Sequence, residues 1–61
     1  MPLVTVKALE GRTIEQKRGL VKDITEAVVK NFGVEADKVT IDIIDFSREN
    51  LAKDGKLFAD Q

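Results

Sequence analysis

Two segments of the chain alternate apolar and polar side chains in the way that is typical of β-strands. Residues 3–9 are rich in β-branched side chains, and residues 38–46 repeat this character with more apolar positions. Successive side chains of a strand point to opposite faces, so Val39, Ile41 and Ile43 are expected to share one face of the second strand. The opposite face carries Thr40, Asp42, Ile44 and Phe46.

Between these two segments, apolar residues return at steps of three and four, which is the period of an amphipathic helix. Thr13 and Gln16 have the spacing of a capping box at the start of this helix. Gly33 is suited to the left-handed conformation that ends a helix. The pattern predicts a helix between Thr13 and Gly33. The residues on its apolar stripe are Leu20, Val21, Ile24, Ala27, Val28 and Asn31.

A strand, a long helix and a second strand form a β-α-β unit, whose crossover is expected to be right-handed and whose strands should be parallel. The tail, residues 47–61, is polar, with Asp54-Gly55 as a turn signal and Leu57-Phe58 as a small apolar anchor. We therefore predict an α+β fold: one β-α-β unit followed by a short C-terminal hairpin or tail. Residues 1–61 are expected to form a single domain.

A chain of 61 residues has little core of its own, and small domains usually need a disulfide, a metal or self-association. The sequence has no cysteine and no histidine, which excludes disulfides, thiolate and imidazole catalysis and the common zinc sites. No acidic loop has calcium-loop spacing. The exposed sheet edges of a lone β-α-β unit invite pairing with another copy. We expect a homo-oligomer in which two units form a four-stranded sheet carrying two helices.

The charges are balanced, with 10 basic and 11 acidic residues interspersed and a net charge of −1. This distribution lacks the basic stripe that a phosphate backbone requires, so nucleic acid is not an expected partner. The apolar runs are too short to span a bilayer, and no signal peptide is apparent. The chain is expected to be soluble and cytoplasmic, with no membrane partner.

The only proline directly follows the initiator methionine. If Met1 is removed, the Pro2 nitrogen becomes a secondary amine, and an ordinary α-amino group has a pKa of roughly 8. Burial among apolar groups or a neighbouring cation lowers such a pKa toward neutrality, where a general base is most effective. In a chain without histidine or cysteine, this amine is the best candidate for acid–base work. The alternative is that Pro2 only starts a strand at its edge.

Arg12 lies after the first strand and immediately before the helix cap. Its permanently charged, forked guanidinium suits the bidentate capture of a carboxylate, and the adjacent helix N-terminus also favours an anion. Together with Pro2 it could hold an acidic substrate within reach of a basic amine. The alternative is that Arg12 is simply solvated after the glycine turn.

These motifs in this order resemble the 4-oxalocrotonate tautomerase family: MP, the β-branched strand, LEGRT, EQK, the helix and a second apolar strand. The resemblance covers the entire chain. It implies β-α-β proteins that assemble mostly as hexamers, as trimers of dimers. It further implies a cofactor-independent, metal-independent isomerase that moves a proton between carbon and oxygen of small enol or dienol acids, such as 2-hydroxymuconate-like acids. By this match Pro2 is the proton shuttle, Arg12 binds a substrate carboxylate in its own or a neighbouring subunit's site, and the Leu9 backbone amide polarises the substrate oxygen.

The chain departs from the family pattern at two positions. Thr40 stands where well-studied members have a second arginine, and Leu51 stands where they have an aromatic wall. Asp42, on the same face as Thr40, adds a negative charge there. Three cations are candidates to compensate, namely Lys38, Arg48 and Lys53. The alternative function is a weakly active or inactive member of the family that serves as a binding or assembly module.

Overall fold

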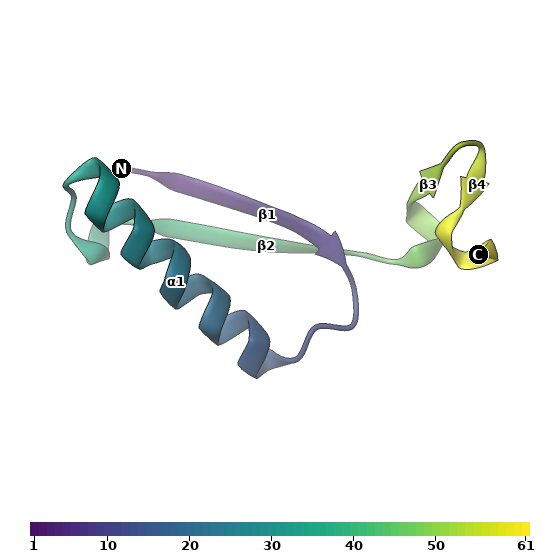
Figure 1. The fold of residues 1–61 in the computed structure, drawn as a ribbon, viewed down its shortest axis with the longest axis horizontal. Coiled ribbons are helices and arrows are strands. Elements are labelled where there is room, and N and C mark those ends of the chain that lie inside the picture. Colours follow the sequence, from purple (N-terminus) through teal and green to yellow (C-terminus); the bar gives the residue numbers. More distant parts are fainter.

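The computed structural model describes all 61 residues, and its main body is a two-stranded sheet with one long helix (Figure 1). Strand β1 spans Leu3–Leu9, helix α1 spans Ile14–Phe32 and strand β2 spans Thr40–Phe46. A small hairpin follows, made of β3 (Ala52–Lys53) and β4 (Lys56–Leu57). Three short 3-10 helices connect or end these elements: η1 (Ala36–Lys38), η2 (Arg48–Asn50) and η3 (Phe58–Asp60).

Strands β1 and β2 are parallel, which confirms the predicted β-α-β unit. Their register pairs Leu3 with Thr40 at one end and Leu9 with Phe46 at the other. The predicted start of the second strand at Lys38 is wrong by two residues. The Lys38 amide donates to the Glu35 carbonyl at 3.0 Å, inside the turn that forms η1. A backbone amide that bonds locally cannot join the ladder, so β2 begins only at Thr40.

Helix α1 begins and ends where its capping residues predict. The Thr13 hydroxyl accepts from the Gln16 amide at 3.1 Å, and the Gln16 side chain accepts from the Thr13 amide at 2.8 Å, which completes the capping box. Gly33 has φ = 69°, and its amide donates to the Val29 carbonyl at 3.0 Å. No helix combines the length and the apolar character needed to cross a membrane.

The C-terminal hairpin turns at Asp54 and Gly55, both of which have positive φ, 54° and 78°. Two consecutive left-handed residues form the tight turn that matches the twist of a hairpin. The hairpin folds back on η2, where the Phe58 amide donates to the Leu51 carbonyl at 2.8 Å and Arg48 Nη2 donates to the Phe58 carbonyl at 3.0 Å. In Figure 1 this small unit lies away from the sheet and the helix, as an arm at the end of β2.

The isolated chain buries none of its 61 residues. Its accessible surface is 4898 Å², against about 3950 Å² expected for a compact monomer of this mass. Its radius of gyration is 14.8 Å, against about 10.5 Å for a compact domain of this length. Several large apolar side chains are exposed, among them Leu3 at 64% and Ile44 at 41%, both on the sheet face opposite the helix. The fold therefore offers apolar surface that a single copy cannot cover.

Candidate active site

Pro2 lies at the end of the sheet where β2 begins. It is half-buried, and its carbonyl accepts a hydrogen bond from the Thr40 amide at 3.0 Å. Met1 is 88% exposed, and its sulfur accepts from the Thr40 hydroxyl at 3.6 Å. While Met1 is attached, the Pro2 nitrogen is an amide without basicity. Loss of Met1 would leave a ring amine here and would free the Thr40 hydroxyl.

Leu9 and Arg12 lie at the opposite end of β1 from Pro2. A strand rises about 3.3 Å per residue, so the seven steps from Pro2 to Leu9 span about 23 Å. Pro2 and Arg12 of one chain therefore cannot contact the same small molecule. The structure does not bring the expected site residues together within a single copy.

The backbone of β1 has one paired edge and one open edge, because the sheet has only two strands. The Pro2 carbonyl and the Glu10 amide both bond to β2, the latter to the Phe46 carbonyl at 2.8 Å. Since backbone groups alternate in direction along a strand, the amides of odd-numbered residues point to the open edge. The Leu9 amide is one of these, so it is available to a group that lies outside its own sheet.

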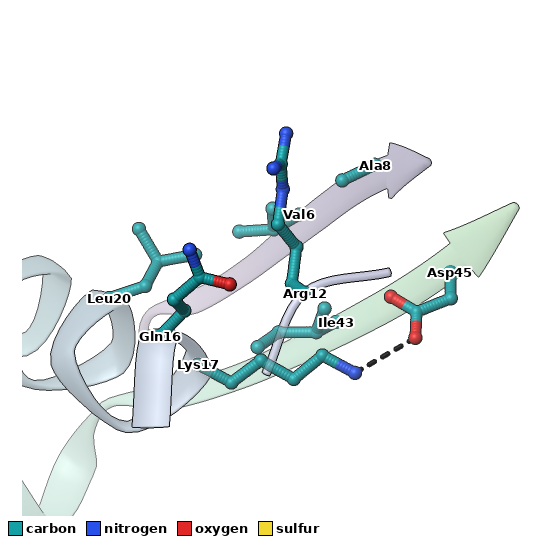
Figure 2. Close-up of a pocket in the computed structure, with 8 residues that line it drawn as sticks. All are labelled: Val6, Ala8, Arg12, Gln16, Lys17, Leu20, Ile43 and Asp45. Atoms are coloured by element: carbon teal, nitrogen blue, oxygen red, sulfur yellow. Dashed lines mark hydrogen bonds and ion pairs between the residues drawn. The ribbon is translucent and has the colours of Figure 1, made fainter. Parts of the chain in front are cut away.

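Arg12 borders a cavity of about 260 Å³ between the first turns of α1 and the carboxyl-terminal half of the sheet (Figure 2). Arg12 is exposed, makes no ion pair, and points away from the ion pair on the cavity's other side. Its charge is thus free for a ligand. The other residues that line the cavity are Val6, Ala8, Gln16, Lys17, Leu20, Ile43 and Asp45.

The ion pair in this cavity joins Lys17 of α1 to Asp45 of β2, with Nζ and Oδ2 2.8 Å apart. Neither residue is among those that the sequence singles out as candidates. A signal was nevertheless present, because Asp45 continues the apolar face of Ile41 and Ile43, and Lys17 lies one turn before Leu20 on the helix stripe. The pair ties the start of the helix to the end of the sheet, next to Arg12.

The residues that replace the family pattern lie in two different places. Thr40 and Asp42 are exposed on the sheet face opposite the helix, at the end that holds Pro2. Leu51 is half-buried beside the C-terminal hairpin. Of the three candidate compensating cations, Arg48 donates to the Phe58 carbonyl, Lys38 lies in η1 and Lys53 lies in β3. None of them joins the Thr40 side chain in a hydrogen bond, and Lys38 and Lys53 make no ion pair.

Comparison with known proteins identifies the relatives of this chain. The family model described as tautomerase enzyme matches residues 2–61. The 2-hydroxymuconate tautomerase of Bacillus subtilis is 47% identical over 60 residues, covering 98% of this chain and 97% of that protein. Tautomerases are isomerases, the class of enzyme that the sequence predicts.

Solved structures with the same fold belong to the same group. The crystal structure of YwhB, a homologue of 4-oxalocrotonate tautomerase, superposes with a TM-score of 0.93 at 45% identity, covering 98% of both chains. A heterohexameric 4-oxalocrotonate tautomerase from Chloroflexus aurantiacus superposes with a TM-score of 0.89 at 29% identity, covering 97% of this chain and 95% of that one. From the full-length family match and these relatives, the chain belongs to the tautomerase family of isomerases, among the homologues of 4-oxalocrotonate tautomerase.

Proposed function

We propose that this chain is a cofactor-independent tautomerase that converts small enol or dienol carboxylic acids, of which 2-hydroxymuconate is the model, into their keto forms. Pro2, freed of Met1, is the general base and acid, Arg12 binds a substrate carboxylate, and the Leu9 amide binds the substrate oxygen. The proposal includes a single domain over residues 1–61 and a cytoplasmic location.

The observation that carries the proposal is the open edge of β1, with Pro2 at one end and Leu9 and Arg12 at the other. If β1 of two copies pairs antiparallel, the start of each strand lies beside the end of the other. Pro2 of one copy would then lie near Leu9 and Arg12 of its partner. The same pairing gives a four-stranded sheet with two helices on one face. Each dimer would contain two complete sites.

In this arrangement the Pro2 amine accepts the proton of the enol hydroxyl, and the oxygen's electron pair forms the carbonyl as the double bond shifts. The resulting prolinium then returns a proton to a substrate carbon, so that one hydrogen has moved from oxygen to carbon. The Leu9 amide stabilises the negative charge that develops on oxygen, and a donor aimed at such charge contributes strongly to catalysis. Arg12 holds the carboxylate so that the carbon lies within reach of Pro2.

We propose further that dimers assemble into a homohexamer. The large uncovered surface of the single copy supports this, because Leu3 and Ile44 remain exposed on the sheet face that the helices leave free. The Chloroflexus aurantiacus relative, which is a heterohexamer, shows that this fold can form six-chain assemblies.

The test compares the mature protein with the Pro2→Ala variant in the ketonisation of 2-hydroxymuconate. The reaction is monitored through the loss of the ultraviolet absorbance of this substrate. Intact mass must first show that Met1 is absent from both. We expect Pro2→Ala to lower kcat by at least tenfold, because a flexible primary amine lacks the fixed direction of the ring nitrogen. Sedimentation should show the same assembly for both proteins. Equal turnover would mean that Pro2 only starts β1, and no turnover by either protein would favour the assembly-module alternative.

A further inference from the structure

The cavity beside Arg12 is lined by three charged side chains, and two of them are paired with each other (Figure 2). Lys17 Nζ lies 2.8 Å from Asp45 Oδ2, and these two side chains are 29% and 37% exposed. Arg12 lines the same cavity but makes no ion pair. The cavity therefore holds two cations and one carboxylate, and the carboxylate is bound by the lysine.

The local structure determines this choice of partner. Asp45 is the register partner of Ala8, whose small apolar side chain offers the carboxylate no hydrogen bond. The Lys17 amide donates to the Thr13 carbonyl at 3.1 Å, so the first turn of α1 holds the base of the lysine side chain. From this position the Lys17 ammonium donates to the Asp45 carboxylate. Asp45 thus depends on Lys17 for the neutralisation of its charge.

Without Lys17, the Asp45 carboxylate would be left unpaired in a cavity with several apolar walls. Arg12 is the remaining cation that lines this cavity. A guanidinium binds a carboxylate through two parallel hydrogen bonds, which makes it a strong partner. Asp45 would then compete with the carboxylate of a substrate for the same Arg12 side chain.

We propose that Lys17 is a positioning residue that occupies Asp45 and thereby keeps Arg12 available to the substrate carboxylate. The inference rests on the proposed function, since it concerns the residue that binds the substrate there. Lys17 itself does not touch the substrate. Its pair with Asp45 also joins the start of α1 to the end of β2, so the test must separate the competition for Arg12 from this structural role.

The expected effect follows from the strength of partly exposed ion pairs. An exposed pair changes an equilibrium by up to about fivefold, and a charge-assisted hydrogen bond changes it by about tenfold or more. We therefore expect pairing of Arg12 with Asp45 to raise KM for a carboxylate substrate by about three- to tenfold. The pairing competes with binding and not with proton transfer, so kcat should change by less than about twofold.

The experiment measures kcat and KM for 2-hydroxymuconate at one fixed ionic strength, with the mature protein, Lys17→Met and Lys17→Met/Asp45→Asn. Methionine keeps the unbranched stem of lysine and its helix propensity but loses the charge. We expect Lys17→Met to raise KM about three- to tenfold and the double variant to return KM to within about twofold of wild type. Both variants lack the ion pair, so a merely structural role would raise KM equally in the two.

A second comparison places Lys17→Met in the Arg12→Ala background. There it should change kcat/KM by less than about twofold, because Asp45 no longer has Arg12 to compete for. The control is Lys22→Met, which removes the same charge from the same helix at a side chain that is 76% exposed and pairs with Glu26. It should leave KM unchanged. Lys17→Gln makes the same charge change and replaces Lys17→Met if that variant does not fold.

Three results would overturn the inference alone. They are an unchanged KM in Lys17→Met, a failure of Asp45→Asn to restore KM in the double variant, and an equal effect of Lys17→Met with and without Arg12. The last of these would mean that Lys17 acts through its charge on the substrate directly. Turnover that does not require Pro2, or that is unaffected by Arg12→Ala, overturns the proposed function and the inference together.

Discussion

Arg12 offers the sharpest test of how the substrate is held, because it performs no structural work within the chain. Its guanidinium is exposed and makes neither a hydrogen bond nor an ion pair. The helix beside it is capped by Thr13 and Gln16 without its help. Arg12→Ala should therefore leave the fold intact, and any loss of activity should come from the missing substrate contact.

The expected loss follows from the chemistry of the contact. A hydrogen bond to a charged group contributes about 1.5–3 kcal/mol, which corresponds to roughly 10- to 150-fold in kcat/KM. Most of the loss should fall on KM if Arg12 binds substrate and transition state equally. A parallel fall in kcat would mean that Arg12 also orients the reacting carbon. Arg12→Lys should recover only part of the activity, because an ammonium keeps the charge but loses the forked geometry.

The assay is steady-state ketonisation of a carboxylate enol acid by the mature protein, Arg12→Ala and Arg12→Lys at one fixed ionic strength. Arg18→Ala is the matched control. Arg18 lies in the first turns of the same helix, is 65% exposed and pairs with Glu15. Arg18→Ala removes the same charge from the same region of the helix, and Arg18 does not line the cavity beside Arg12. Thermal unfolding of each variant checks that the fold is retained.

Two outcomes would refute this reasoning. If Arg12→Ala keeps wild-type kcat/KM for a carboxylate substrate, Arg12 is solvated and does not bind the substrate. If Arg18→Ala lowers kcat/KM as much as Arg12→Ala does, the substrate is attracted by the overall positive charge of this region and not by a specific contact with Arg12.

Two further predictions concern assembly and stability. The Lys7 amide points to the open edge of β1, so Lys7→Pro should keep the β1–β2 ladder but block pairing with a second copy. Sedimentation at micromolar concentration should then show a smaller species than wild type, with Lys7→Thr as the control; unchanged sedimentation would mean that β1 edges do not pair. Gly19 lies within α1, and a Cβ built there meets no atom within 4 Å. Gly19→Ala should therefore stabilise the protein by about 0.5–1 kcal/mol in chemical denaturation, and a loss of stability would indicate close approach of another copy at that position.

The local elements were predictable because each depends on residues that are near in sequence. The alternation in residues 3–9 and the Thr13–Gln16 capping box set the bounds of β1 and the start of α1, and Gly33 set the end of the helix. The start of β2 was not predictable from alternation alone. Val39 fits the apolar face of a strand, but its amide donates to the Ala36 carbonyl at 3.1 Å in a local turn. Side-chain pattern does not report where a backbone amide bonds.

The sequence proposes the candidate site as a set of residues, and their places in the fold come only from the structure. Pro2 and Arg12 are recognisable from their chemistry and from the motifs around them, yet β1 holds them at opposite ends. In the proposed dimer their meeting depends on the pairing of strand edges between copies, and such pairing leaves no periodic signal in one chain. The Lys17–Asp45 ion pair escaped prediction for a related reason, since it joins residues 28 positions apart whose contact requires the helix to lie across the sheet.

The exposed surface and the divided site have the same physical origin. A single copy buries none of its residues and holds Pro2 about 23 Å from Leu9, so the proposed dimer would serve both the stability of the chain and the proposed chemistry. Pairing along the open edge of β1 would supply both at once. A variant that weakens this pairing should therefore lose stability and turnover together, whereas Arg12→Ala should lose turnover alone. That difference separates residues that build the site from residues that act in it.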